Sequence, residues 1–430
     1  MRRSAVVLVA LLISSSALAD ALQDCGKLRG KAAIVACDYV IRQNPTNAIA
    51  YYNRGSAHSE TKEYDQAIED FNRAIKLNPK FVFAYTNRAV AYQAKGEYDQ
   101  AIADYSKAIV TDPKFVLAYN NRGNTYIAKR EYDQAIIDYT KALAIDPRFV
   151  PAYYNRASAY GHKKDYYRAI ADYSTAIEIN PRYAPAYVNR GTAYYYQNEY
   201  DQAIADYTKV LQSHSKLDPA RYTRGAVYFD RKTYDEATVY KNRGEAYYAK
   251  KEYDQAIDDY TKTIERNPKY ASAYYERASA LVHRQKYDLA IADYTKLIEF
   301  APNAATYSMR GVAYNERGQQ RGDITDQDRA IADYTKALEL DPKFAPAYNN
   351  RAWAYFKAGN AAQGLADAEK ALELTPNYPR ALDTRGNIFE ALGRRDEAIA
   401  DFRRALSVGA DDPEVQIRGK EALTRLGASP

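Results

Sequence analysis

One spacing constrains this chain more than any other feature. A triplet recurs along it, usually asparagine, then arginine, then glycine or alanine, and most intervals between successive triplets are 34 residues. The small third residues of the triplets are Gly55, Ala89, Gly123, Ala157, Gly191, Gly225, Gly244, Ala278, Gly311, Ala352 and Gly386. A fixed period of this length indicates an array of stacked units, although 430 residues alone would suggest two or three ordinary domains.

Each unit predicts two amphipathic helices. In residues 97–109, EYDQAIADYSKAI, the apolar residues follow the i, i+3, i+4, i+7 spacing of one helix face. Asp99 predicts a cap for the start of this helix, and Asp112 followed by Pro113 predicts its end. The preceding helix carries its own apolar stripe. Neither helix buries its stripe alone, so stability is expected to come from contacts between neighbouring units.

The period, the small residues and the prolines that end most units resemble the tetratricopeptide repeat family over about residues 48–413. The resemblance implies an all-α solenoid of helix-turn-helix units, wound as a right-handed superhelix. With the small residue placed eighth in each unit, the units begin at Ala48, Val82, Val116, Val150, Ala184, Asp218, Ala237, Ala271, Ala304, Ala345 and Pro379. Residues 20–47 are expected to cap the first unit, and residues 413–430 to form a C-terminal capping helix.

Charged residues recur at two unit positions. Where the family usually has leucine in seventh place, this chain has Arg54, Arg88, Arg122, Arg156, Arg190, Arg224, Arg243, Arg277, Arg310, Arg351 and Arg385. The second helices carry Asp70, Asp104, Asp138, Asp172, Asp206, Asp259, Asp293, Asp333, Asp367 and Asp401. We predict a partly buried ladder of arginine–aspartate pairs that sets register, because a guanidinium fork suits a carboxylate. The alternative is that both groups simply reach solvent.

The array has a seam between Gly225 and Gly244, where the step is only 19 residues. Residues 211–218 also lack the usual proline stop. These departures favour two arrays, residues 48–236 with a truncated last unit and residues 237–412, joined by a continuous or kinked helix over residues 234–250. A tolerated deletion within one array is the alternative.

A second irregularity is the step of 41 residues between Gly311 and Ala352, which adds seven residues to the turn at 315–329. Asp323, Asp326 and Asp328 miss the alternating acidic spacing and central glycine of a calcium-binding loop. The insertion therefore predicts a solvated loop.

The first 19 residues are typical of a secretory signal peptide. They have Arg2 and Arg3, an apolar run over residues 5–13, and an A-x-A site at residues 17–19. We therefore expect an exported protein, periplasmic or secreted, and no membrane span after removal of the leader, since no later apolar run approaches about 18 residues. A retained N-terminal anchor is the alternative.

Export favours a disulfide between Cys25 and Cys37, the only two cysteines. One straight helix would separate them by roughly 18 Å, too far for a bond. We predict a break at Gly26 or Gly30 that folds Cys25 back onto a helix over about residues 31–42. Two buried thiols are the alternative.

Catalytic and cofactor-binding patterns are not evident. His58, His162, His214 and His283 are scattered without metal-ligand spacing, and the S-x-x-K at residues 213–216 lacks an accompanying K-T-G triplet. We expect no enzyme activity, cofactor or metal. The net charge of +6 is mild and its charges are interspersed, so no nucleic acid is expected as a partner.

The first helices of the units leave a second stripe at unit positions 2, 5, 9 and 12. Resemblance to the family implies that this stripe forms a concave wall where partners bind. The wall would hold Tyr52, Phe83, Asn120, Asn124, Tyr154, Tyr195, Tyr222, Tyr248, Tyr275, Asn349, Trp353 and Phe356. The recurrent asparagine at position 6 is expected to brace neighbouring units.

An aromatic, amide-rich wall favours a non-enzymatic scaffold that binds an extended peptide or protein, because tyrosine gives rigid contacts at low entropic cost. The lysine–asparagine pairing with which some family members hold a C-terminal carboxylate is absent from it. One alternative is a cell-envelope polysaccharide-binding protein or an export or assembly factor, since aromatic faces and amides also suit sugars. A purely structural array that self-associates through its ends is another.

Overall fold

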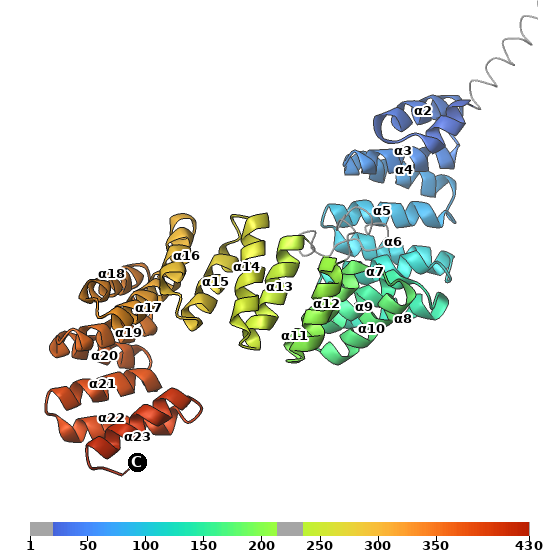
Figure 1. The fold of residues 1–430 in the computed structure, drawn as a ribbon. Coiled ribbons are helices and arrows are strands. Elements are labelled where there is room, and N and C mark those ends of the chain that lie inside the picture. The colour runs from blue at the N-terminus through green and yellow to red at the C-terminus, as the bar shows by residue number, and fades with distance from the viewer. Residues whose placement is uncertain (1–19, 213–234, 430) are drawn as a thin grey trace, which may run out of the picture. The chain divides into compact units, whose positions relative to one another are not determined.

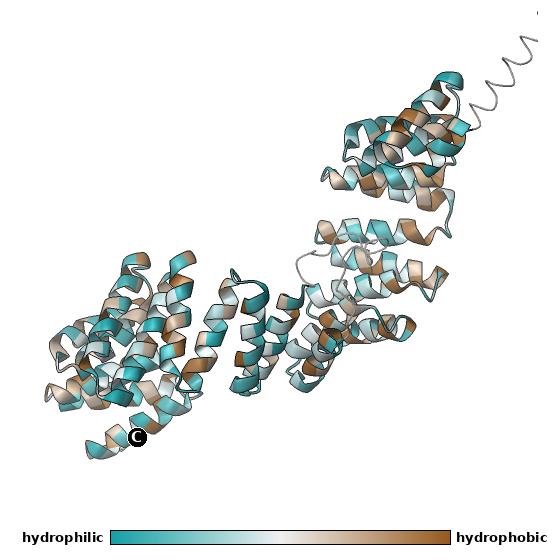
Figure 2. Ribbon diagram, turned by 45° about the horizontal axis from the view of Figure 1, so that its top comes forward, coloured by the Kyte–Doolittle hydropathy of each residue, from teal (hydrophilic) through white to brown (hydrophobic). Residues whose placement is uncertain are grey.

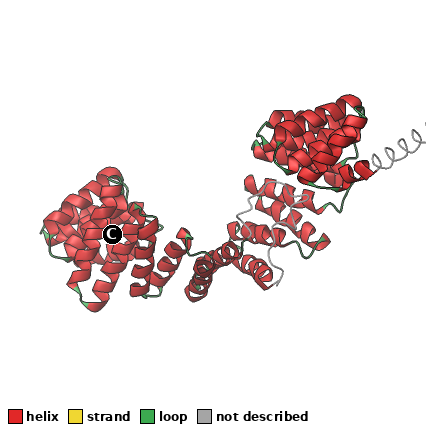
Figure 3. Ribbon diagram, turned by 90° about the horizontal axis from the view of Figure 1, so that it is seen from above, coloured by secondary structure: helices red, strands yellow, loops and turns green. Residues whose placement is uncertain are grey.

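The computed structural model describes residues 20–212 and 235–429, and in those residues every regular element is a helix (Figures 1 and 3). The all-α helix-turn-helix prediction is confirmed. Apolar and polar residues alternate along the helices, as Figure 2 shows, because each helix buries only one face. None of the helices described here is long and apolar enough to cross a membrane.

The helices alternate between first and second members of each unit. The first helices are α3 (Ala48–Glu60), α5 (Val82–Ala94), α7 (Val116–Ala128), α9 (Val150–His162), α11 (Ala184–Tyr196), α13 (Glu236–Ala249), α15 (Ala271–His283), α17 (Ala304–Arg321), α19 (Ala345–Lys357) and α21 (Pro379–Ala391). The second helices are α4 (Tyr64–Leu77), α6 (Tyr98–Thr111), α8 (Tyr132–Ile145), α10 (Tyr166–Ile179), α12 (Tyr200–Gln212), α14 (Tyr253–Arg266), α16 (Tyr287–Phe300), α18 (Ile324–Leu340), α20 (Ala361–Leu374) and α22 (Arg395–Val408). Helix α2 (Gly30–Gln43) precedes this series, and α23 (Pro413–Arg425) follows it.

The chain divides into two compact units, residues 1–234 and 235–430. The helix expected over residues 234–250 corresponds to α13. Its N-cap is Asp235, whose backbone is extended and whose side chain accepts a hydrogen bond from the Thr238 amide at 2.6 Å. Because a capped helix begins at that point, α13 does not run back through Asp235. Tyr234 and the part of the expected seam that precedes it, residues 213–233, lie outside the described residues.

The ends of α6 confirm one expectation and correct another. Asp112 is the C-cap, so the predicted end at Asp112 and Pro113 is confirmed. The predicted cap at Asp99 is wrong, because Glu97 occupies the N-cap position and no side chain caps the helix. Asp99 lies in the first turn and instead pairs with Lys129 of the next unit, at 2.9 Å.

The small eighth residue of each unit allows its two helices to approach closely. A Cβ atom built on Gly123 would lie 2.6 Å from the Tyr139 ring. Tyr139 is fully buried, as are its counterparts Tyr105, Tyr207 and Tyr260. The core of most described units is therefore an aromatic ring of the second helix seated on a small residue of the first, whereas the unit that begins at Ala345 has Ala368 in place of the ring.

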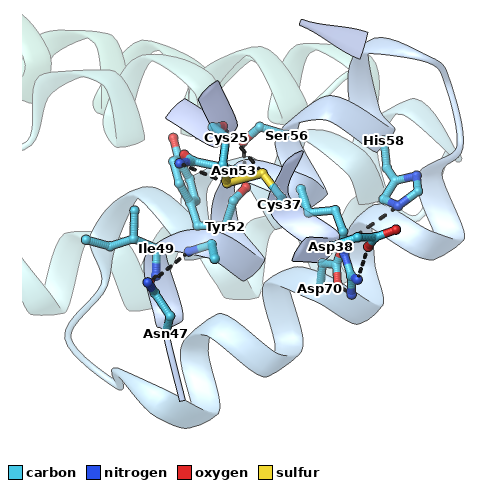
Figure 4. Close-up of a disulfide and its surroundings, with 12 residues drawn as sticks. Cys25, Cys37, Asp38, Asn47, Ile49, Tyr52, Asn53, Ser56, His58 and Asp70 are labelled. Carbon is cyan, nitrogen blue, oxygen red and sulfur yellow. Dashed lines mark hydrogen bonds and ion pairs between the residues drawn. A yellow bond between two sulfur atoms is a disulfide. The ribbon is translucent and has the colours of Figure 1, made fainter. Parts of the chain in front are cut away.

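The N-terminal segment folds back on itself, as predicted. Residues 20–27 are helical, the chain breaks at residues 28 and 29, and α2 begins at Gly30, whose φ of +54° favours glycine. Gly26 lies inside the first helix and does not form the break. The fold brings Cys25 and Cys37 into a disulfide with a Cα–Cα separation of 4.7 Å, so that prediction is confirmed (Figure 4).

The seven-residue insertion is not the solvated loop that was predicted. It lengthens both helices of its unit, α17 and α18, which meet at a short turn where Gly322 adopts a left-handed conformation. Arg317 donates two hydrogen bonds to the Asp326 carboxylate, both at 2.7 Å, and Asp326 is buried. The prediction failed because Asp326, one of the three acidic residues in the inserted segment, is held inside by an ion pair.

Candidate binding surface

The predicted arginine–aspartate ladder is present in all ten pairs that the described residues contain. In each pair, Nε and Nη2 of the arginine donate to the two carboxylate oxygens at 2.5–2.8 Å. The pairs link the first helix of a unit to its second helix. Each aspartate is buried, so the alternative of two solvated groups is wrong. Arg224 lies outside the described residues.

The ladder also joins successive units, which the sequence reasoning missed. In seven of the ten described pairs the remaining nitrogen of the guanidinium, Nη1, donates a hydrogen bond to a side chain of the preceding unit. Arg122 donates to the Ser106 hydroxyl at 2.8 Å, and Arg277 donates to the Thr261 hydroxyl at 3.0 Å. The signal was available, because a serine or threonine stands two residues after most of the ladder aspartates.

Three of the asparagines at position 6 brace neighbouring units, as expected, whereas Asn121 and Asn350 accept hydrogen bonds from the residue that precedes them. Asn155 donates to the Asn120 side-chain oxygen of the preceding unit at 3.0 Å, and Asn87 donates to the Tyr52 hydroxyl at 3.0 Å. Asn189 contacts Tyr154 in the same way, at 2.9 Å. Some residues expected to face a partner therefore also hold one unit against the next.

In the first compact unit, residues 1–234, which we call the N-terminal unit, the predicted wall residues occupy different environments. Phe83 is exposed and meets Phe115 edge-on, with ring centroids 5.3 Å apart. Tyr195 is half-buried, whereas Asn124 is buried and accepts a hydrogen bond from the Tyr139 hydroxyl at 2.7 Å. Asn120 and Tyr154 are also buried, Tyr52 is half-buried, and Tyr222 lies outside the described residues.

In the second compact unit, residues 235–430, which we call the C-terminal unit, four predicted wall residues meet at one cavity of about 670 Å³. Tyr248 comes from α13, Tyr275 from α15, and Asn349 and Trp353 from α19. Phe356 packs beside Trp353, with ring centroids 5.4 Å apart. These residues come from first helices, so the cavity follows the stripe that the unit register predicts.

The same cavity is lined by charged residues, of which the predicted stripe at positions 2, 5, 9 and 12 includes Arg380 and Asp383 but not the other three. Glu316 lies on α17, one residue past position 12, and Glu414 and Arg418 come from the terminal helix α23. Asp383 and Arg380 complete the charged lining. The repeat register could not identify Arg418, since α23 stands outside the repeats.

Ion pairs organise one side of the cavity. Arg418 pairs with Asp383 at 2.8 Å and lies 4.6 Å from the centre of the Trp353 ring. Arg380 pairs with Asp412 at 3.1 Å. Burial raises the pKa of Asp383 above its usual range, and Arg418 offsets only part of this rise.

The histidines do not gather at one site. His58 hydrogen-bonds Glu63 at 2.6 Å, and His162 stacks on Tyr132. His283 lines the cavity edge and stacks on a tyrosine of the preceding unit, whereas His214 lies outside the described residues. Across residues 20–212 and 235–429, no group of histidine, cysteine or acidic residues has the arrangement of a metal site.

In each of the two compact units, the paired helices contact mainly their neighbours in sequence. This arrangement defines an α-solenoid. Comparison with known families agrees with this class. Tetratricopeptide repeats match residues 48–81, 71–103, 91–129, 116–149, 150–183, 184–215, 237–270, 271–303, 325–359, 345–378 and 379–411. The chain belongs to the tetratricopeptide repeat family, whose members generally serve as protein–protein interaction scaffolds and are typically non-enzymatic.

Individual relatives add little beyond the fold. A tetratricopeptide repeat protein from Parabacteroides merdae has a TM-score of 0.50 and 21% identity, over 64% of this chain and 98% of that protein. A thermophilic member from Thermus thermophilus has a TM-score of 0.39 and 22% identity, over 44% and 99%. The small glutamine-rich tetratricopeptide repeat-containing protein 2 of Saccharomyces cerevisiae is 45% identical over 58 residues, which is 11% of this chain and 17% of that protein.

Proposed function

We propose that this protein is a non-enzymatic scaffold whose aromatic, amide-rich groove binds an extended peptide or protein partner. The observation that carries the proposal is the cavity of the C-terminal unit, lined in turn by α13, α15, α17, α19, α21 and α23. A surface that takes side chains from successive helices suits a ligand that runs along the stack. Tyr248, Tyr275 and Trp353 supply the large apolar contacts, and Asn349 supplies polar ones.

We propose also that the protein acts in an exported, oxidising compartment, periplasmic or extracellular. Two observations support this. Residues 1–19 have the pattern of a secretory leader, and the only two cysteines of the chain form a disulfide. Structural disulfides persist in oxidising compartments and are rare in the reducing cytosol, so this bond favours an exported location.

The experiment uses residues 20–430, immobilised, for selection from a random dodecapeptide library beside a panel of envelope glycans. We expect selected peptides to bind, and Tyr275→Ala to weaken that binding by about tenfold or more. The matched control is Tyr167→Ala, since Tyr167 is 79% exposed and does not line the cavity.

Three results would refute the scaffold proposal. The first is a selection that yields no peptide. The second is binding that survives Tyr275→Ala unchanged. The third is retention of a glycan without any peptide, which would favour the polysaccharide-binding alternative.

A further inference from the structure

The cavity of the C-terminal unit has more hydrogen-bond acceptors than its own donors satisfy. Asn315 and Asn349 are only 7% and 5% exposed, and the side-chain oxygen of each has no hydrogen-bond partner within the described structure. One carboxylate oxygen of Asp383 is in the same condition. A buried acceptor left unpaired is unfavourable because it has lost its hydrogen bonds to water, so each of these oxygens favours a ligand that brings a donor.

The orientation of the two amides agrees with this reading. The amide nitrogen of Asn349 donates to the Asn350 oxygen at 3.4 Å. Asn315 hydrogen-bonds the carboxylate of Glu316 beside it, which requires its amide nitrogen to point that way. The nitrogens are therefore already engaged, and the oxygens remain.

The charges of the cavity leave a negative surplus. Arg418 is engaged by Asp383 at 2.8 Å and by Glu414 at 3.3 Å, and Arg380 is engaged by Asp412 at 3.1 Å. Glu316 has no ion pair among the residues that the structure describes, although it is half-buried. Burial and the nearby Glu414 both raise its pKa, as expected for a carboxylate that lacks a cation.

The Trp353 ring is not the place for an incoming cation, because two cations already lie over it. Arg418 is 4.6 Å and Lys357 is 4.7 Å from its centre. The acceptors on α17 and α19 remain, and these two helices contact each other directly.

We propose that Glu316, Asn315 and Asn349 form a subsite for a primary ammonium group, carried as a lysine side chain by the partner. An ammonium has three donors and no acceptor, which complements one carboxylate and two amide oxygens. Tyr248 and Tyr275 line the same cavity and cover the aliphatic stem of the lysine. The subsite rests on the proposed function, because it selects one side chain of the extended ligand.

The test uses the fluorescence of Trp353, the only tryptophan in the chain, which lines the cavity. The probes are three end-capped pentapeptides of alanine with lysine, norleucine or N-acetyl-lysine in the centre. We expect the lysine peptide to change the emission with saturation, and the two neutral peptides to bind about tenfold more weakly. Glu316→Gln and Asn349→Leu should each remove most of that preference.

The control variant is Glu390→Gln. Glu390 is a glutamate of the neighbouring helix α21 that pairs with Arg425 at 2.6 Å and does not line the cavity, so this change should leave the lysine preference intact. Equal binding of the three peptides, or an unchanged preference in Glu316→Gln with native helix content, would overturn the subsite.

The experiments distinguish the failure of one proposal from the failure of the other. If the library yields peptides that depend on Tyr275 but show no lysine preference, the scaffold stands and the subsite falls. If the library yields no peptide and none of the three pentapeptides changes the Trp353 emission, the scaffold falls and the subsite falls with it.

Discussion

Replacement of Arg122 by methionine tests the ladder most directly. Arg122 donates two hydrogen bonds to Asp138, both at 2.7 Å, and a third to Ser106 of the preceding unit at 2.8 Å. The Asp138 side chain is only 4% exposed. Arg122→Met therefore leaves a buried carboxylate without its cation, and we expect a loss of about 3–5 kcal/mol in local stability at pH 7.

The loss should depend on pH in a definite direction. Burial already raises the pKa of Asp138 above its ordinary value, and removal of Arg122 raises it further. A carboxyl group whose folded pKa is raised contributes its stability below the unfolded pKa and loses it as the pH rises through the folded pKa. Arg122→Met should thus be least damaging in acid and most damaging above neutrality.

A double variant separates the lost pair from the stranded charge. Arg122→Met with Asp138→Leu should lose less than Arg122→Met alone, since no buried charge remains, and the coupling should fall within about 0.5–3 kcal/mol. The matched control is Lys129→Met, because Lys129 pairs with Asp99 at 2.9 Å while the two side chains are 29% and 84% exposed. That change should lose less than about 1 kcal/mol.

The assay is amide hydrogen exchange in α7 and α8 of the full chain, because a repeat array need not unfold in one step. The reasoning would be refuted if Arg122→Met lost no more protection than Lys129→Met. It would also be refuted if the effects of Arg122→Met and Asp138→Leu simply added.

Three further predictions concern separate parts of the fold. Cys25→Ser should lower the stability of α2 and α3 by about 3 kcal/mol, as hydrogen exchange measures, and reduction of the unaltered protein should have the same effect. Gly161→Ala should stabilise α9 by up to about 1 kcal/mol, because nothing lies within 4 Å of the new methyl group. Gly123→Ala should destabilise the packing of α7 on α8 by about 1–3 kcal/mol, because its methyl group meets Tyr139 at 2.6 Å. Melting curves of the two variants should therefore shift in opposite directions. Burial, with a smaller contribution from a nearby glutamate, raises the pKa of Glu276 from 4.5 to about 7. The C-terminal unit should therefore lose stability progressively as the pH rises from about 4.5 to about 7 in urea titrations, and Glu276→Gln should abolish this contribution.

The helix pairs and the arginine–aspartate ladder could be predicted because the sequence is periodic. The arginine–aspartate pairs recur at one fixed offset in most units, so a single geometric argument covers ten pairs. The disulfide between Cys25 and Cys37 could be predicted for a different reason, because export favours a bond between the only two cysteines and the length of a straight helix then requires a break between them. Both predictions depend on local distances along the chain.

The failures arose where tertiary contacts outweighed local pattern. Asp99 has the residue type of a helix cap, yet it pairs with Lys129 of the next unit. The inserted segment looked like a loop because of its acidic residues, yet Arg317 draws Asp326 into the interior. Arg418 lay beyond the repeats, so no register could bring it to the cavity.

These outcomes separate what is constant in the array from what varies. In each of the ten pairs that the described residues contain, the ladder uses the arginine at position 7 and the aspartate of the second helix, so these two positions hold the units in one register and are not available for partner specificity. Position 5 is free to change, and along the C-terminal unit it is Tyr275 in one repeat, Asn349 in a later one and Asp383 in the last. These three residues line one cavity, where the lining changes from aromatic to amide to carboxylate. A partner that runs along this surface would therefore need an apolar group opposite Tyr275 and hydrogen-bond donors opposite Asn349 and Asp383. The ladder keeps the spacing between these contacts constant.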